Sequence, residues 1–308
     1  MNFIKSILKV LIIVVLIFIL NYVRIIISYK LNKNKYIEFS EIYGNRNGYA
    51  PQGLTYSKKY DIILQTAYSK YGDFSILYVT NFKTGRLEKE IKLLKNDGQK
   101  NNNHVGGITT NDDKVWITSD YEINEYSLEE MVNTDKSYLK SLNDQKLYNR
   151  GDFCTYYDNI LWIGEFFLNG IYEVKDNNPL LMGYNLSEKI DYFKPAYIIS
   201  LPKMVQGMGI TKDNKFVLTM SYSGLINSEL VVYENILNKK NYYYELNGNS
   251  IKYYKFNNNS KIKTIKLPPM AEEFFIKDEA YYILFESGSD RYVTAFPKID
   301  KIIKIRFK

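Results

Sequence analysis

An internal repeat constrains this chain more than any other feature of its sequence. Five segments share one order: a polar start, a short apolar strand, a turn rich in Lys, Asp and Asn, and a strongly apolar second strand. Two apolar runs on either side of a turn are the pattern of a β-hairpin. Such a pattern at near-regular intervals indicates repeated units that bury their apolar faces against one another. The segments begin at Gln52, His104, Gly151, Gln206 and Glu272.

The spacing of the repeats indicates their architecture. Their leading polar residues, at positions 52, 104, 152, 206 and 272, are 52, 48, 54 and 66 residues apart. Common propeller blades take roughly 40 to 50 residues. In the first interval, residues 75–79 and 87–94 supply a third and a fourth strand. The sequence therefore predicts an all-β fold, a β-propeller of about five four-stranded blades, with six as the alternative if the longest interval contains another blade.

The last blade needs a strand from elsewhere in the chain. After the fifth hairpin, residues 301–307 have the pattern of a third strand, and no fourth strand follows them. Residues 36–43 have a strand pattern and precede the first repeat, so they can pair beside residues 301–307. This closure leaves no long unpaired edge, the feature that promotes aggregation of sheets. We therefore expect one propeller domain over residues 36–308, closed by its N-terminal strand.

An apolar segment precedes the propeller. Residues 7–27 are apolar except for Lys9, Asn21 and Arg24, and as a helix they would reach roughly 31 Å, enough to cross a bilayer. No run of small residues marks a signal-peptide cleavage site. We therefore expect residues 1–30 to be an uncleaved signal-anchor, residues 31–35 a basic linker, and the protein to be a single-pass membrane protein. Positive charges flank both ends of the segment; we favour an exported, extracytoplasmic propeller.

The net charge of +7 suggests nucleic acid as a partner, but its distribution argues against one. Six of the 41 Lys and Arg precede residue 36, where there is no acidic residue. The remaining 35 basic and 34 acidic residues leave the propeller almost neutral, so no basic groove for phosphates is expected. The single cysteine, Cys154, lies in an apolar run, which predicts a buried and unreactive thiol.

The polar residues of the repeats predict a ring around the central channel. In a propeller, the innermost strand of each blade starts, and the second strand ends, on the same face. Gln52, His104, Asp152, Gln206 and Glu272 begin the inner strands, and Asp120, Glu165, Ser221 and Glu286 lie near the ends of the second strands. This ring has two interpretations. Its polar side chains either form hydrogen bonds with backbone groups and with water in the channel, or they form a binding site. The predicted ligand-binding residues are Gln52, His104, Asp152, Glu165, Gln206, Glu272 and Glu286.

Two kinds of chemistry fit this ring. The oxygen atoms of Asp152, Glu165, Gln206 and Glu286 are of the type that binds Ca²⁺. His104 is the only histidine, which excludes a multi-histidine zinc site. With Glu165, it is the candidate catalytic residue of a calcium-assisted hydrolase, in which it would act as general base; the alternative is a hydrogen-bonded loop histidine. The chain has no GxSxG, phosphate-loop, HExxH or CxxC motif.

Several motifs resemble known propellers. Residues 78–81 read YVTN, and the chain resembles the broad group of YVTN-repeat, NHL-repeat, lactonase and glutamine cyclotransferase propellers. It resembles bacterial exported and membrane-anchored propellers more closely, which implies the fold and export. The motifs that carry this likeness are residues 51–54 (PQGL), 104–108 (HVGGI), 161–166 (LWIGEF), 205–208 (VQGM), 267–270 (LPPM) and 284–287 (LFES).

The functional hypotheses belong to different classes. The first is a membrane-anchored scaffold that binds a small molecule or a protein at the propeller mouth. The alternative is a Ca²⁺-dependent lactonase or esterase, and a third, weaker one is a glutamine cyclotransferase-like acyl transferase. Residues 238–260, rich in Tyr and Asn, predict a protruding hairpin, with an aromatic partner-binding patch as the alternative.

Overall fold

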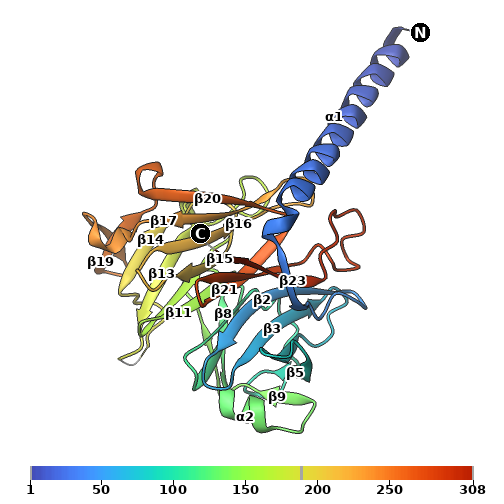
Figure 1. The fold of residues 1–308 in the computed structure, drawn as a ribbon. Coiled ribbons are helices and arrows are strands. Elements are labelled where there is room, and N and C mark those ends of the chain that lie inside the picture. The colour runs from blue at the N-terminus through green and yellow to red at the C-terminus, as the bar shows by residue number, and fades with distance from the viewer. Residues whose placement is uncertain (1, 188–189, 307–308) are drawn as a thin grey trace.

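A computed structural model describes residues 2–187 and 190–306. It shows a five-bladed β-propeller from which one long N-terminal helix projects (Figure 1). The five sheets are the five blades, and the predicted hairpins form the two innermost strands of each. Blade one contains β2 (Tyr49–Ser57), β3 (Ile62–Ser69), β4 (Ile76–Asn81) and β5 (Leu87–Leu94), with β9 (Tyr138–Lys140) added in parallel. Blade two contains β6 (Gly107–Thr110), β7 (Lys114–Ser119), β8 (Glu122–Ser127) and β10 (Asn143–Lys146), and α2 (Leu128–Asn133) follows β8.

The other three blades repeat this plan. Blade three contains β11 (Phe153–Tyr157), β12 (Ile160–Gly164), β13 (Leu180–Asn185) and β14 (Tyr197–Ser200), and blade four contains β15 (Val205–Ile210), β16 (Phe216–Met220), β17 (Ser228–Tyr233) and β20 (Lys261–Leu267). Blade five contains β21 (Ala271–Lys277), β22 (Ala280–Phe285), β23 (Lys301–Arg306) and β1 (Ile37–Glu41). Short 3₁₀ helices occupy Lys33–Lys35, Lys175–Asn177, Ile236–Asn238 and Asn258–Ser260.

The predicted closure of the ring is confirmed. Strand β1 pairs antiparallel with β23, with Ile37 opposite Lys304 and Glu41 opposite Lys301. The outermost strand of blade five thus comes from the opposite end of the chain. Phe39, at the centre of β1, packs its ring 4.9 Å from that of Phe82, in the β4–β5 turn of blade one. One strand therefore completes blade five and helps to join it to blade one.

The long fourth interval contains no sixth blade, and its hairpin does not protrude freely as predicted. β18 (Tyr242–Leu246) and β19 (Asn249–Lys255) form the hairpin, and β19 pairs in parallel with β14. The hairpin thus extends blade three to six strands. Leu246 and Ile251 are buried in the blade-three core, which explains why the hairpin lies against the sheet.

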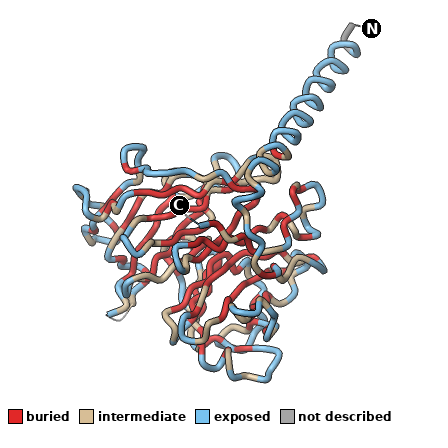
Figure 2. The backbone as a smooth tube through the Cα atoms, in the orientation of Figure 1, coloured by how far each residue is buried: buried red, intermediate tan, exposed pale blue. Residues whose placement is uncertain are grey.

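The ring is held together by close approach of the inner strands at its axis. A Cβ atom at Gly107 would lie 2.5 Å from the backbone nitrogen of Cys154, and one at Gly53 would lie 2.8 Å from Ile108 Cγ2. Only glycine permits these distances, which explains the glycine in the repeated motifs. Cys154 is buried, as predicted. Figure 2 shows that burial is concentrated in the blades, whereas most of the N-terminal helix is exposed.

The N-terminal helix, α1 (Asn2–Asn32), is long and apolar enough to cross a membrane, and it is the only such helix within residues 2–187 and 190–306. A signal sequence would show the same length and composition. The last turns of α1 pack on the propeller, where Ile25 is buried. The helix is therefore attached to the domain rather than tethered by a free linker.

Candidate functional site

The two faces of the propeller differ in chemistry. We call the face where the inner strands begin the start face and the face where they end the end face. The start face carries the predicted polar ring. Among its residues, Gln52 and Glu272 are buried, Gln206, Asp152 and Glu286 are half-buried, and His104 is exposed. The structure therefore brings the predicted residues to one face, but it divides them into separate groups.

Four of these residues form one hydrogen-bonded chain across blades one, four and five, which we call the start-face array. Gln52 Nε2 donates to Glu286 Oε2 at 3.2 Å, and Gln206 Nε2 approaches Glu272 Oε1 at 3.4 Å. The two carboxyl groups are hydrogen-bonded to each other. The array thus runs Gln52–Glu286–Glu272–Gln206.

The carboxyl pair of the array holds a proton. Burial raises the pKa of Glu272 well above its usual range, and the Glu286 charge raises it further. Burial also raises the pKa of Glu286, while hydrogen bonds from Tyr292, Glu272 and Gln52 lower it. Glu272 therefore keeps its proton, and its O–H donates a hydrogen bond to the Glu286 carboxylate. Two adjacent carboxyl groups, of which the surroundings keep one protonated and the other ionised, are typical of binding and catalytic sites.

His104 lies beside the array in a different environment. Its ring centroid is 4.2 Å from that of Tyr68, whose hydroxyl accepts a hydrogen bond from Arg291 Nη1. Although its side chain reaches solvent, desolvation by the surrounding loops lowers the pKa of His104 to about 4, with help from the charges of Arg291 and Arg150. The imidazole is therefore neutral at pH 7. With this pKa it is a weak base, because efficient general bases titrate near the working pH.

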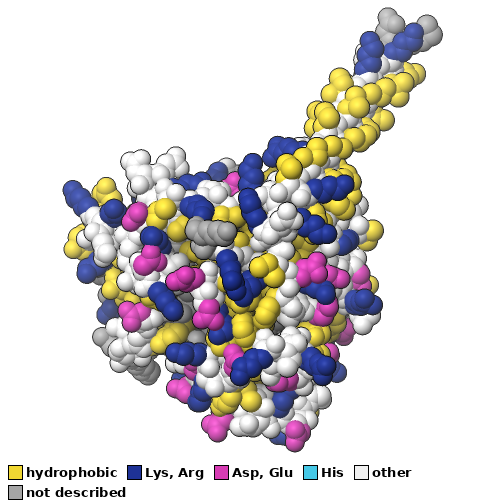
Figure 3. Space-filling view, viewed as in Figure 1, with side chains coloured by type: hydrophobic (Ala, Val, Ile, Leu, Met, Phe, Trp, Pro, Cys, Tyr) yellow, Lys and Arg dark blue, Asp and Glu magenta, His cyan; other side chains and the backbone are white. Residues whose placement is uncertain are grey.

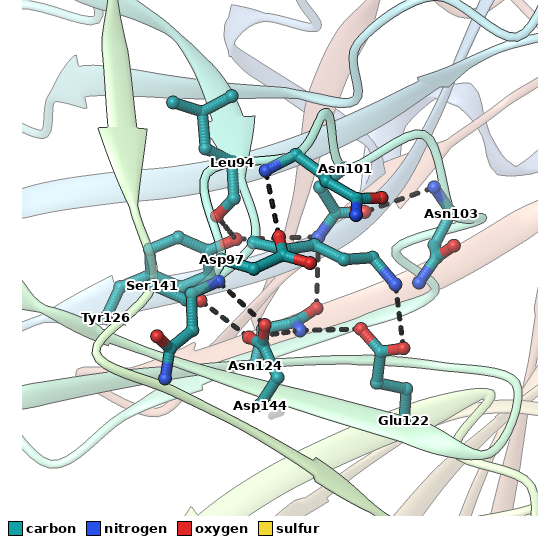
Figure 4. A network of polar contacts seen from close by, with 12 residues as sticks. Leu94, Asp97, Asn101, Asn103, Glu122, Asn124, Tyr126, Ser141 and Asp144 are labelled. Carbon is teal, nitrogen blue, oxygen red and sulfur yellow. Dashed lines mark hydrogen bonds and ion pairs between the residues drawn. The ribbon is translucent and has the colours of Figure 1, made fainter.

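A buried polar network positions the loop that carries His104 (Figure 4). Asn101 Nδ2 donates to Asn124 Oδ1 at 3.0 Å, and Asn124 Nδ2 donates to Asp144 Oδ1 at 2.7 Å. The loop is also held by Asn103, whose carbonyl accepts from Ser75 Oγ at 2.6 Å. These bonds join the loop to β8 and to Ser75, directly before β4, and they join β8 to β10. His104 is therefore presented by an ordered backbone.

Asp152 and Glu165 are engaged with the protein itself. Both Asp152 carboxylate oxygens accept from Arg150 Nε, at 2.7 and 2.9 Å, and one also accepts from the backbone N–H of Phe166 at 2.7 Å. Glu165 accepts from the backbone N–H groups of Arg150 and Leu180 at 3.2 and 2.9 Å. Sequence reasoning missed Arg150, which adjoins the Gly151–Asp152 motif.

This arrangement fits a calcium site poorly. Within the described residues, no group of three or more His, Cys, Asp or Glu is placed to hold a metal ion. The Arg150 guanidinium occupies both oxygens of Asp152 and places a positive charge where a cation would bind. We therefore derive no chemical step through Ca²⁺.

Glu273, which the sequence analysis did not single out, lies at the centre of the ring. Its Oε2 accepts from the backbone N–H groups of Leu54 and Ile108, both at 3.1 Å, and its Oε1 accepts from that of Cys154 at 3.0 Å. These donors belong to the inner strands of blades one, two and three. Burial raises the pKa of Glu273 well above its usual range, although the three N–H donors lower it. The side chain links blade five to three other blades across the channel.

The end face is hollowed, which the sequence analysis did not predict. A cavity of about 1070 Å³ opens there, and the ends of all five inner strands line it. Its walls carry hydroxyl groups and aromatic rings, and lysine and acidic side chains lie at its rim. Several hydroxyls are already engaged: Thr155 Oγ1 donates to the Met208 carbonyl at 2.9 Å, and Thr109 Oγ1 accepts from the Tyr156 N–H at 2.8 Å. The lining residues include Tyr56, Thr109, Thr155, Tyr156, Tyr157, Lys58 and Lys212.

The raised carboxyl pKa values predict that the protein is less stable at alkaline pH. Burial raises the pKa of Asp152 to about 6 and that of Glu165 to about 7. Above pH 4.5 the folded protein therefore binds more protons than the unfolded chain, so stability falls as the pH rises through these values. His104 acts in the opposite direction between about pH 4 and 6.5, but it is outnumbered by the carboxyls.

We expect the thermal midpoint to be several degrees lower at pH 8 than at pH 5, since each pKa unit corresponds to about 1.4 kcal/mol. Scanning calorimetry across this range measures the effect. In Glu165→Gln the dependence on pH should be shallower, whereas Asp213→Asn, at an exposed turn, should leave it unchanged. A midpoint that rises steadily from pH 5 to pH 8 would contradict the assignment.

Fold and site together define a class: a five-bladed β-propeller with a cluster of titratable side chains on one face. Among solved structures, a glutaminyl cyclase of Myxococcus xanthus is similar with a TM-score of 0.51 and 7% identity, over 88% of this chain and 95% of that one. A PQQ-bound aldose sugar dehydrogenase of Streptomyces coelicolor is similar with a TM-score of 0.50 and 11% identity, over 88% and 96%. At these identities the likeness shows the propeller fold alone. No known protein family and no curated protein matches the sequence.

Proposed function

We propose that this protein is a membrane-anchored binding propeller, with α1 as its anchor and the propeller outside the cytoplasm. Its start-face array binds a small neutral ligand that carries hydroxyl or amide groups. The observation that supports this proposal is the Gln52–Glu286–Glu272–Gln206 chain, where a proton-sharing carboxyl pair lies between two amides. Amides both donate and accept hydrogen bonds, and the carboxylate accepts them, so the array matches groups that do both.

The charges around the array favour a neutral ligand. The proton shared by Glu272 and Glu286 leaves one negative charge on the pair, and Arg291 lies close enough to Glu286 to lower its pKa. Arg150 and Asp152 compensate each other by an ion pair of 2.7 Å. Aromatic rings, those of Tyr68 and Tyr292, adjoin these groups. A ligand with a net charge would lie close to a charge of the same sign, either that of the carboxyl pair or that of Arg291, and this contact would be unfavourable.

Ligand-observed NMR tests the binding proposal. Saturation-transfer spectra of the full chain in detergent micelles are recorded with neutral sugars and with N-acetylated, amidated dipeptides as probes. We expect signals from at least one of the two classes, and Gln206→Ala combined with Glu286→Gln should weaken binding about tenfold or more, because hydrogen bonds to charged groups contribute about 1.5–3 kcal/mol. Lys58→Ala, exposed on the end face, is the control. The proposal would be refuted if the double variant gave the same signals as Lys58→Ala, or if neither the sugars nor the dipeptides gave a signal.

Acyl chemistry is the second candidate function, and the carboxyl pair is the observation that favours it. A protonated Glu272 beside an ionised Glu286 supplies an acid and a base within one hydrogen bond, as hydrolysis of a lactone or ester, or cyclisation of an amine onto an acyl group, requires. The NMR spectra separate the two functions when a lactone and a glutaminyl dipeptide are added. Product resonances that disappear in Glu272→Gln indicate catalysis, and unchanged probes indicate binding alone.

A further inference from the structure

The last turns of α1 are fixed to the start-face side of blades four and five. The ring of Tyr22 packs against that of Phe296 at a centroid distance of 5.2 Å. Ile25 is 2% exposed, and Asn227 Nδ2 donates to Ser28 Oγ at 3.0 Å. Asn227 and Phe296 both belong to loops that connect the second and third strands of their blades. The propeller therefore has a defined position along the axis of α1.

The exposed part of α1 is only just long enough for a bilayer. Residues 4–23 are all exposed, and at about 1.5 Å per residue they span roughly 30 Å, the thickness of the hydrocarbon core. Figure 3 shows this shaft as apolar, with basic side chains at its far end and near its base. Lys5 and Lys9 lie toward the far end of α1 and Arg24 lies at its base, and tyrosine, lysine and arginine anchor helices at the membrane interface. The bilayer surface on the propeller side must therefore lie near residues 22–24.

The Phe296 contact places one loop of the propeller at this same level. Residues 286–300, which we call the blade-five loop, connect β22 to β23. The backbone N–H of Tyr292 donates to the Ser289 carbonyl at 3.2 Å, and that of Ala295 donates to the Tyr292 carbonyl at 3.0 Å. These bonds fix the tip of the loop, where Val293 is 82% exposed. No other large hydrophobic side chain among the described residues is as exposed as Val293.

We propose that the blade-five loop lies in the headgroup layer of the membrane that α1 crosses, with Val293 inserted among the lipids. Arg291 and Lys298, on the same loop, are bonded within the protein, to the Tyr68 hydroxyl and to the Ser289 carbonyl, so the proposal rests on the position of the loop beside α1 and on its exposed apolar tip. This proposal rests on the membrane anchoring proposed above. The same loop supplies Tyr292 to Glu286 and Arg291 to Tyr68, so membrane contact and one wall of the start-face array share a single ordered segment.

Site-specific fluorescence tests this position, and the chain is suited to it because its only cysteine, Cys154, is buried. Val293→Cys is labelled with an environment-sensitive dye in the full chain, which is reconstituted in nanodiscs of phosphatidylcholine and phosphatidylglycerol. Headgroup-nitroxide lipid is then added as quencher. We expect a blue shift of emission relative to the same labelled chain in detergent micelles and strong loss of fluorescence with the nitroxide lipid. The unsubstituted chain shows the labelling background.

Two further positions separate the possible failures. Ile12→Cys, at the middle of the exposed helix, should be quenched by a nitroxide on the acyl chain, which reports the anchor itself. Lys212→Cys, in the β15–β16 turn on the end face, should show neither quenching nor a shift. Quenching at Ile12 without quenching at Val293 would overturn the loop proposal and leave the anchor intact. Absence of quenching at Ile12 would overturn the anchor and the loop proposal together.

Discussion

Replacement of Glu273 by leucine is expected to destabilise the whole propeller by several kcal/mol and to prevent folding if the domain has an ordinary margin of stability. The carboxylate accepts hydrogen bonds from Leu54, Ile108 and Cys154 on three blades. Leucine leaves these buried N–H groups without partners, at about 1–3 kcal/mol each. The sum, about 3–9 kcal/mol, compares with a total stability of about 5–15 kcal/mol for a typical domain.

The milder variant Glu273→Gln makes this prediction quantitative even if the leucine variant does not fold. In Glu273→Gln, the amide oxygen can replace Oε2 and accept from Leu54 and Ile108, but the amide NH₂ then faces the Cys154 N–H. One hydrogen bond is lost, so we expect a loss of about 1–3 kcal/mol in urea unfolding. The transition is followed by the fluorescence of Trp116 and Trp162, both buried.

The adjacent Glu272 supplies a matched control. It is also buried, but its carboxyl O–H donates a hydrogen bond to Glu286, and a glutamine amide N–H can donate in the same direction. Glu272→Gln should therefore be less destabilising than Glu273→Gln, because its hydrogen bond to Glu286 is kept whereas Glu273→Gln leaves a buried N–H without a partner. If Glu273→Gln were no more destabilising than Glu272→Gln, the central role of Glu273 would be refuted.

The contrast between these two neighbours shows what the sequence could reveal. The blades could be predicted from the repeats, because hairpin patterns and the glycines beside them are local features of the sequence. The same repeats predict that the strand over residues 36–43 closes the ring. The hydrogen-bond partners of Glu273, in contrast, are not close to it in the sequence. A glutamate in an apolar strand signals a buried acceptor, but its donors lie 119 to 219 residues away in the chain. Only the assembled ring brings them within hydrogen-bond reach.

The same reason limits prediction of the site. Gln52, Gln206, Glu272 and Glu286 were predicted as ligand-binding residues, and the structure places them in one hydrogen-bonded chain. Asp152 and Glu165 met the same sequence criterion, but Arg150 and nearby backbone N–H groups occupy their oxygens. The end-face cavity depends on where the strands end in space, and the β18–β19 hairpin depends on an exposed edge of β14, neither of which a repeat pattern encodes.

Deletion of residues 36–43 is expected to unfold all five blades together. β1 is the outer strand of blade five, and it contributes Phe39, whose ring lies 4.9 Å from both Phe82 and Tyr282. Without it, β23 has an unpaired edge, and the blade-one contact through Phe39 is lost. Because every inner strand packs on two neighbours in a closed ring, weakening one junction lowers the stability of the others. We expect loss of most of the folding free energy, which is about 5–15 kcal/mol for a typical domain.

The two tryptophans make this prediction decisive, because they belong to blades two and three, whereas the deleted strand pairs with blade five and packs on blade one. Trp116 is on β7 of blade two and Trp162 on β12 of blade three. Cooperative unfolding shifts their fluorescence transition and the circular-dichroism transition to the same lower urea concentration. Glu38→Ala, also on β1, removes a 3.9 Å ion pair with Lys301 of β23 and should shift stability by less than about 1 kcal/mol. If the deletion left the tryptophan transition in place while part of the circular-dichroism signal was lost, blade five would fray alone, and the strand would be an attachment to the ring rather than its closure.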